Sequence, residues 1–283
     1  MGIFESLLSY NPFKTNSTNL NGKLVLITGG SSGIGLGFCE LVLKAYPQVK
    51  LVVVDLNKPS FDCTFIKCDL SKAQEVKKVF KDIAEKQGIP DVFILNAGIQ
   101  HAARLDDVTD EQYERIIDVN FKNSFYSVKP FLKGFKERKS GHLVFTCSVA
   151  SFISAPFGVP YCASKAGALS LANGIRSELI DYNIKVSTLT PGHIKTKLFP
   201  DFKVKYNWFM PSLEPGYVSN SIFDIVQHNE SQQWMRPLYS LLLPLLYLLP
   251  PELVIKVSKV TGGYESLVPK EFTAVNGTPQ IKK

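Results

Sequence analysis

The 283-residue sequence lacks several features that define particular classes of protein. Its five cysteines are an odd number without C-x-x-C spacing and lie mostly in apolar stretches, so we expect reduced core thiols in a cytosolic environment rather than a disulfide framework. Its four histidines, His101, His142, His193 and His228, show no ligand spacing, and we expect no metal site. Its 32 lysines and arginines are scattered and the net charge is only +7, which argues against nucleic acid as a partner.

Long uninterrupted apolar segments are also missing. Residues 1–8 have no basic region followed by an apolar stretch, so we expect neither a secretory signal nor a spanning helix there, although Gly2 and Ser6 fit the short pattern for N-myristoylation. Residues 238–249 are apolar on nearly all sides, but a helix of this length is only ~18 Å long against ~30 Å of hydrocarbon, and Pro244 interrupts it. The segment fits either a helix dipping into one leaflet or one buried over a pocket or in a dimer.

Apolar runs bounded by turn residues alternate with helix-period segments from residue 23 to residue 190. This alternation predicts an α/β fold with a doubly wound, mainly parallel sheet of the Rossmann type and helices on both faces. The expected strands are residues 23–28, 50–55, 64–69, 91–96, 142–148 and 184–190, and the expected helices are residues 33–46, 71–87, 109–138 and 160–182. Residues 57–63 are too few for a crossover helix, so we expect a loop or a single turn there.

The chain divides into three expected regions. We expect a leader over residues 1–21, a dinucleotide-binding and catalytic domain over residues 22–230, and an apolar C-terminal extension over residues 231–283 that packs on the domain or on a membrane. Within the domain, Ser71 with Gln74 and Thr109 with Gln112 predict the N-termini of two helices.

A glycine-rich segment, Thr28-Gly-Gly-Ser-Ser-Gly-Ile-Gly35, joins the first expected strand to the first expected helix. Glycines at these positions let the backbone turn tightly and approach a pyrophosphate, whose charge the helix N-terminus receives. Asp55 ends the next strand 20 residues beyond Gly35, where a ribose-binding carboxylate is expected. This carboxylate favours NAD over NADP because it repels a 2′-phosphate, although Lys58 could soften the preference. Alternatively, Asp55 only shapes the turn after its strand.

Tyr161 and Lys165 lie at the start of the helix expected at residues 160–182, and their spacing places phenol and ammonium on one helical face. A lysine cation beside a positive nicotinamide ring stabilises phenolate, and so moves the pKa of a tyrosine from about 10 toward neutral pH. Such a pair also occurs by chance, as a core tyrosine and a solvated lysine. However, Ser148 ends the fifth strand 13 residues before Tyr161, so both side chains are expected at the carboxyl edge of the sheet, where open α/β folds bind ligands.

Together these motifs resemble the short-chain dehydrogenase/reductase family over about residues 23–196. The resemblance rests on the glycine-rich segment, Asn96-Ala-Gly98, Asn120, Ser148, Tyr161 with Lys165, and Pro191-Gly192. It departs from the family at Leu95, where many members have a second asparagine. The resemblance implies that Ser148 holds the substrate oxygen and that Tyr161 exchanges its proton. It also implies that Lys165 binds the nicotinamide ribose and lowers the tyrosine pKa, and that Asn120 supports a proton relay.

The resemblance further implies an NAD(P) site and a set of residues that contact it. The expected cofactor contacts are Gly29, Ser31, Ser32, Gly33, Ile34, Gly35, Asp55, Asp69, Asn96, Ala97, Gly98, Tyr161, Lys165, Pro191, Gly192, Ile194 and Thr196. The Thr at the last of these positions commonly contacts the nicotinamide carboxamide in the family. His193, between Gly192 and Ile194, is either a substrate contact or a polar loop histidine.

The expected substrate is lipophilic. Residues 195–210 interleave aromatic side chains with lysines, which suits the cover of a lipophilic pocket or a membrane interface. The C-terminal region more loosely resembles retinol, hydroxysteroid and long-chain alcohol dehydrogenases, which implies the cytoplasmic side of the endoplasmic reticulum or a lipid droplet, or otherwise the cytosol. Family analogy also implies a homodimer. The alternatives are the same chemistry on a small polar carbonyl or acyl thioester, and a non-catalytic dinucleotide-binding scaffold.

Overall fold

The computed structural model describes residues 17–196, 198, 212–228, 233–234, 248–261, 272–275 and 278–281. Its centre is a seven-stranded sheet in the order β3-β2-β1-β4-β5-β6-β7, in which every neighbouring pair is parallel. The strands are β1 Leu24–Thr28, β2 Lys50–Asp55, β3 Thr64–Lys67, β4 Val92–Leu95, β5 Gly141–Thr146, β6 Ile184–Leu189 and β7 Gln233–Trp234. The expected doubly wound α/β fold is confirmed, and the strand order reverses direction between β1 and β4, where such sheets bind ligands.

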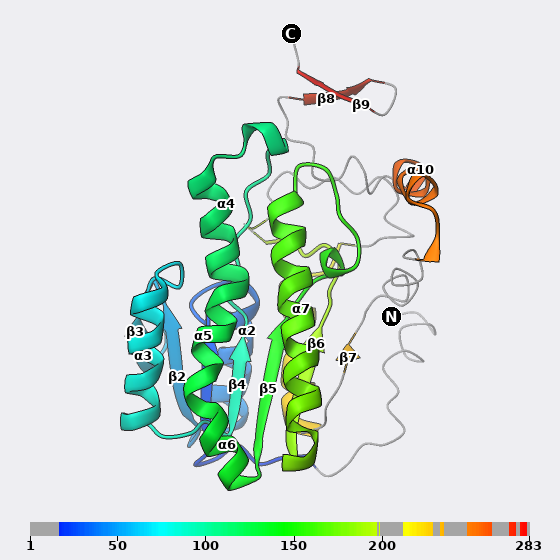
Figure 1. Ribbon diagram of the computed structural model, residues 1–283. Helices are drawn as coiled ribbons and strands as arrows, with labels where there is room; N and C mark the ends of the chain where they lie inside the picture. Colours follow the sequence, from blue (N-terminus) through cyan, green and yellow to red (C-terminus); the bar gives the residue numbers. More distant parts are fainter. Residues whose placement is uncertain are drawn as a thin grey trace.

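Helices cover both faces of the sheet (Figure 1). The helices around the sheet are α2 Gly33–Ala45, α3 Ala73–Lys86, α4 Asp110–Ile117, α5 Asn123–Val128, α6 Leu132–Arg138, α7 Val159–Leu179 and α8 Pro215–His228. Helix α10 Pro251–Thr261 lies apart from the sheet in Figure 1, and a hairpin of β8 Phe272–Val275 and β9 Thr278–Ile281 follows it. In β1, Leu24 and Leu26 pack under α3, α5 and α7, whereas Val25 and Ile27 pack under α2 and α8. The alternation of side chains along each strand therefore builds two separate cores, one on each face.

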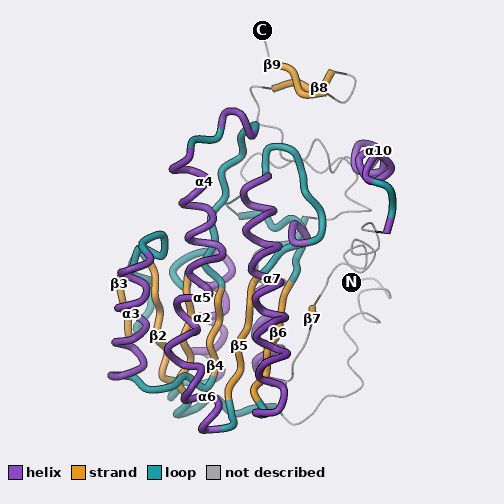
Figure 2. Tube along the Cα trace, viewed as in Figure 1, coloured by secondary structure: helices purple, strands orange, loops and turns teal. Residues whose placement is uncertain are grey.

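The expected long helix over residues 109–138 is a nearly continuous helical run with two irregular turns (Figure 2). Thr109 and Gln112 form the expected capping box at its start. A π-helical turn, η2 Asp118–Lys122, then separates α4 from α5, and a 3-10 turn, η3 Lys129–Phe131, contains Pro130. The π turn adds one residue to a helical turn, so it re-aims the side chains around Asn120.

Several helix and strand boundaries differ from the expected ones, whereas the connection between β2 and β3 is as expected. The connection between β2 and β3 contains no helix, as expected from its short length. Ser71 does not cap α3, which begins after Lys72, because the Ser71 hydroxyl binds Asp69 Oδ1 at 2.7 Å instead. Strand β5 ends at Thr146, and Ser148 caps the following turn, η4 Val149–Ser151.

The sheet takes its last strand, β7, from the region expected to be a C-terminal extension. Residues 238–247, most of the apolar segment, and residues 199–210 of the lysine-aromatic segment lie outside the described residues. Within the described part of the chain, no helix is long and apolar enough to cross a bilayer. All five cysteines are free thiols, and four of them are buried.

Candidate active site

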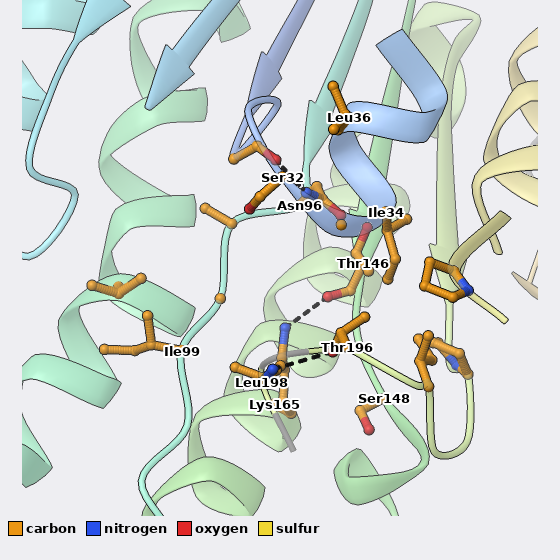
Figure 3. A pocket seen from close by; sticks show the side chains of 18 of the residues that line it. Ser32, Ile34, Leu36, Asn96, Ile99, Thr146, Ser148, Lys165, Thr196 and Leu198 are labelled. Carbon is orange, nitrogen blue, oxygen red and sulfur yellow. Dashed lines mark hydrogen bonds between the residues drawn. The ribbon is translucent and has the colours of Figure 1, made fainter. Parts of the chain in front are cut away.

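A cleft of about 1210 Å³ opens at the carboxyl ends of the parallel strands. Its walls run from the glycine-rich loop, past the ends of β2 and β4, to the residues that follow β5 and β6 (Figure 3). Small-molecule pockets commonly measure about 300–1,000 Å³. The cleft therefore has room for a cofactor and a substrate together.

The glycine-rich loop forms one end of this cleft and fits a diphosphate. Gly29 has a positive φ of 70°, and a side chain on Gly35 would lie 2.0 Å from the Gly29 carbonyl oxygen, so only glycine fits this crossing of loop and helix. At the start of α2, the N-cap residue Ser32 makes no side-chain capping bond, and the first turn contains no acidic residue. The helix N-terminus thus presents backbone N–H groups to an anion.

Asp55 both lines the cleft and orders the loop beside it. Its Oδ2 accepts a hydrogen bond from the Ser31 backbone N–H at 3.0 Å, and its Oδ1 accepts one from the Asn57 N–H at 3.3 Å. The Ser31 hydroxyl donates to the Asn57 carbonyl at 2.5 Å. The two interpretations of Asp55, as a shaper of the turn and as a carboxylate in the cleft, are compatible.

The ends of β3 and β4 supply the next part of the wall. Asp69 accepts bonds from the backbone N–H and hydroxyl of Ser71 and lies 3.7 Å from the Arg115 guanidinium. Burial opposes its charge, but these partners outweigh burial and lower the pKa of Asp69. Asn96 donates from Nδ2 to the Gly29 carbonyl at 3.0 Å, so the end of β4 holds the glycine-rich loop in place.

Ser148 and Tyr161 meet at the other end of the cleft. Both residues line the cleft, although they come from the turn after β5 and from the first turn of α7. Ser148 is 8% exposed and Tyr161 is 5% exposed. Burial raises the pKa of Tyr161 above its ordinary value and outweighs the bond with Ser148, which lowers it.

Lys165 lies one helical turn beyond Tyr161 and points into the same end of the cleft. Its ammonium donates to the Thr146 carbonyl at 2.9 Å, as Figure 3 shows, and lies 5.8 Å from the centre of the Tyr161 ring. Burial lowers the pKa of Lys165. Without a cofactor, burial dominates the pKa of Tyr161, and the expectation that Lys165 lowers this pKa beside a bound nicotinamide stays a prediction.

Asn120 lies behind the wall of the cleft, in the π turn. Its Oδ1 accepts from the Ile99 N–H at 2.8 Å, and its Nδ2 donates to the Ile99 carbonyl at 2.9 Å and to the Ser164 hydroxyl at 3.0 Å. Ser164 in turn donates to the Tyr161 carbonyl at 2.7 Å. Asn120 therefore connects the segment after β4 to the helix that carries Tyr161 and Lys165.

The segment after β6 closes the cleft. The Pro191 carbonyl accepts from the Val149 N–H at 3.0 Å, which places this segment beside the turn that carries Ser148. A β-bridge between Ile194 and Leu213, together with a 2.7 Å bond between the side chains of His193 and Ser212, joins it to the start of α8. We call residues 193–195 with residues 212–214 the neck. Within the neck, burial lowers the pKa of His193 to about 4.

Of the expected site residues, all except Gly35 and Asn120 line this cleft. Sequence reasoning missed a second group of wall residues: Leu36, Leu56, Cys68, Leu70, Ile99, Arg115, Val119, Thr146, Cys147, Ser212 and Pro215. Leu56, Ile99 and Cys147 each adjoin an expected residue at a strand end, so their position was a usable signal. Arg115 and Pro215 lie on helices without a motif, and only the folded chain brings them here.

The fold and the cleft together define a dinucleotide-binding α/β protein. The chain belongs to the short-chain dehydrogenase family of oxidoreductases, since the family model described as short chain dehydrogenase matches residues 23–206. It is 27% identical to short-chain dehydrogenase/reductase 3 of Bos taurus over 87% of this chain and 85% of that protein. It is 29% identical to epidermal retinol dehydrogenase 2 of Mus musculus over 93% of this chain and 90% of that protein.

Solved structures share the fold. A gluconate 5-dehydrogenase from Burkholderia cenocepacia in complex with NADP and tartrate matches with a TM-score of 0.65 and 23% identity, over 76% of this chain and 93% of its own. A short-chain dehydrogenase from Leptospira borgpetersenii with bound NAD+ matches with a TM-score of 0.67 and 24% identity, over 76% of this chain and 91% of its own. Of these two solved structures, one therefore contains NADP and the other contains NAD+.

Proposed function

We propose that the protein interconverts an alcohol and a carbonyl on a lipophilic substrate such as a steroid, retinoid or long-chain lipid, with NAD(H) as the preferred cofactor and Tyr161 as the general acid/base. The presence of Ser148 and Tyr161 in one cleft, with Lys165 one helical turn away and 5.8 Å from the Tyr161 ring centre, is the observation that carries this proposal. Two hydroxyls that converge on one point suit a carbonyl oxygen that gains negative charge during reduction.

In this mechanism, NAD(H) bound in the cleft would supply the hydride-transfer chemistry. Ser148 holds the substrate oxygen by a hydrogen bond. A phenol with an ordinary pKa of about 10 is protonated at neutral pH, and burial favours this form further, so Tyr161 gives its proton to that oxygen in the direction of reduction. The Lys165 ammonium, 5.8 Å from the ring, stabilises the phenolate that remains. Asn120 fixes the helix that carries both side chains through Ser164.

The proposed cofactor contacts follow the walls of the cleft. The N-terminus of α2 would hold the diphosphate, Asp55 the adenosine ribose, and Lys165 the nicotinamide ribose. The carboxylate of Asp55 supports a preference for NAD because it repels a 2′-phosphate, and the glycine-rich loop contains no basic residue.

A lipophilic substrate and a membrane or lipid-droplet surface are proposed on separate grounds. The similarity to epidermal retinol dehydrogenase 2 supports a lipophilic substrate. In α10, Leu253, Ile255 and Val260 are 43%, 49% and 71% exposed, which supports contact with lipid on the cytoplasmic side of the endoplasmic reticulum or of a droplet. A homodimer is proposed from family analogy alone.

The decisive experiment compares the wild type with Tyr161→Phe in a spectrophotometric assay of NADH and NADPH oxidation. The substrates are all-trans-retinal, a steroid ketone, decanal, a small polar ketone and acetoacetyl-CoA. We expect turnover of the lipophilic carbonyls with NADH, a loss of about 10²- to 10⁴-fold in the variant, and unchanged NADH binding.

Tyr182→Phe, which removes a hydroxyl remote from the cleft, should retain full activity and serves as the control. Comparable turnover by Tyr161→Phe would refute the catalytic assignment. Turnover of only the polar ketone or the thioester would favour those substrate classes, and NADH binding without any turnover would favour a scaffold.

A further inference from the structure

Thr146 is the last residue of β5 and lies where the strand meets the cleft. Its carbonyl accepts the hydrogen bond from Lys165 at 2.9 Å (Figure 3). Its side chain is only 9% exposed, and its hydroxyl oxygen is buried without a hydrogen-bond partner. A buried hydroxyl is normally paired, so this one indicates a partner that the protein itself does not supply.

The surroundings of this hydroxyl are apolar. Along β5, Phe145 packs into the core under α7, whereas Val144 packs into the core under α2 and α8. Because side chains alternate along a strand, Thr146 continues the face of Val144. Ile34 and Ile194 belong to the same core and also line the cleft. Packing alone would place valine, which has the same shape as threonine, at this position.

The position along the cleft indicates which part of a dinucleotide meets Thr146. Asp55 and Asp69 lie at the ends of β2 and β3, on one side of β1. Thr146 lies on β5, on the opposite side, with Ser148 two residues further and Lys165 bonded to its carbonyl. A dinucleotide whose adenosine ribose lies at Asp55 therefore has its nicotinamide half beside Thr146.

We propose that Thr146 is a cofactor-positioning residue, whose hydroxyl hydrogen-bonds the nicotinamide half of the dinucleotide while its carbonyl holds the Lys165 ammonium beside it. Rotation about χ1 exchanges the hydroxyl and the methyl group within nearly the same volume, so the hydroxyl reaches a ligand in the cleft without movement of the strand. The inference rests on the proposed function, because it requires that the cleft binds NAD(H).

The test measures binding by the full-length protein rather than turnover. Thr146→Val keeps the shape and removes the hydroxyl, and Thr146→Ser keeps the hydroxyl. NADH affinity is measured from the nicotinamide fluorescence, ADP affinity by calorimetry, and the thermal midpoint without ligand. We expect Thr146→Val to weaken NADH binding about fivefold to tenfold, to leave ADP affinity unchanged, and to keep or raise the midpoint. Thr146→Ser should bind NADH within about twofold of the wild type.

The outcomes separate the inference from the proposed function. NADH affinity of Thr146→Val equal to that of the wild type would overturn the role of Thr146 while leaving the proposed function intact. A parallel fall in NADH affinity, ADP affinity and midpoint would also overturn it, because that pattern assigns the hydroxyl to the fold. If the wild type binds no NADH, the proposed function fails, and the role of Thr146 fails with it.

Discussion

Burial acts on Tyr161 and Lys165 in opposite directions, since it raises the pKa of the phenol and lowers the pKa of the ammonium. In both cases burial favours the uncharged form more than water does. The uncharged phenol is the form of Tyr161 that the proposed carbonyl reduction needs. The proposed alcohol oxidation would need the phenolate, which a bound, positively charged nicotinamide would favour.

His142 provides a prediction about pH and stability. It is fully buried in β5, its Nε2 is bonded to the Ser187 hydroxyl at 2.9 Å, and burial lowers its pKa to about 3. An unfolded histidine titrates near pH 6.5. Between pH 6.5 and pH 3 the unfolded chain binds a proton here and the folded chain does not, so the free energy of unfolding falls as the pH falls.

We expect the titration of His142 to lower the free energy of unfolding by about 2 kcal/mol as the pH falls from 7 to 5. His142→Gln keeps a polar contact with Ser187 but does not titrate, so the variant should lose less stability over the same interval. Urea unfolding at both pH values measures the difference. An equal loss in variant and wild type would show that His142 does not control acid stability.

At the residue scale, the sequence predicted where a side chain lies when the end of a strand or the start of a helix determines its place. Ser148 and Tyr161 were expected at the same edge of the sheet because one follows a strand and the other begins the next helix, and both line the cleft there. The bond from Lys165 to the Thr146 carbonyl was not foreseen, because every residue has a carbonyl and sequence does not mark which one a lysine will reach. The burial that raises the pKa of Tyr161 has no sequence signal, because the depth of burial depends on the whole fold.

At the scale of elements, the crossing of the glycine-rich loop and α2 tolerates no side chain. We expect Gly35→Ala, whose new Cβ would lie 2.0 Å from the Gly29 carbonyl oxygen, to lower the free energy of unfolding by about 1–3 kcal/mol and to weaken NADH binding. Gly174→Ala is the matched control, since it lies within α7 with no atom within 4 Å of the new Cβ.

The control should instead gain up to about 1 kcal/mol, because alanine favours a helix over glycine. Urea unfolding and NADH fluorescence measure the two effects. A Gly35→Ala variant as stable and as tightly binding as Gly174→Ala would contradict the packing argument.

Element positions followed from periodicity, whereas element ends did not. The six expected strands are all present, but β5 ends two residues earlier than expected, because the chain turns at Cys147 to place Ser148 in the cleft. The π turn around Asn120 leaves no periodic signal, since a single extra residue barely changes the spacing of apolar side chains. The two-residue strand β7 is too short to show any alternation.

At the scale of the whole molecule, the C-terminal region contributes both to the sheet and, we propose, to lipid binding. Because β7 pairs with β6, a truncation that tests lipid binding must retain Trp234. We expect the chain truncated after Trp234 to bind NADH and to stay in the dense fraction of a flotation assay with phosphatidylcholine–phosphatidylserine vesicles. The full chain should float.

NADH binding by the truncated chain is the control for folding. Flotation of the truncated chain with the vesicles, to the same extent as the full chain, would contradict a role of residues 235–283 in lipid binding. Failure of the full chain to float would contradict the proposed lipid partner altogether.

The neck separates the sheet and α8 from a segment of the chain that can vary in sequence and length. Its two sides are fixed to each other by the bridge between Ile194 and Leu213 and by the ion pair between Lys195 and Glu214, and they adjoin β6 and α8. Strands β1 to β7 and all the expected cofactor contacts, of which Thr196 is the last along the chain, lie outside residues 199–211. We propose that gene duplication followed by variation confined to residues 199–211 is a route to new substrate ranges.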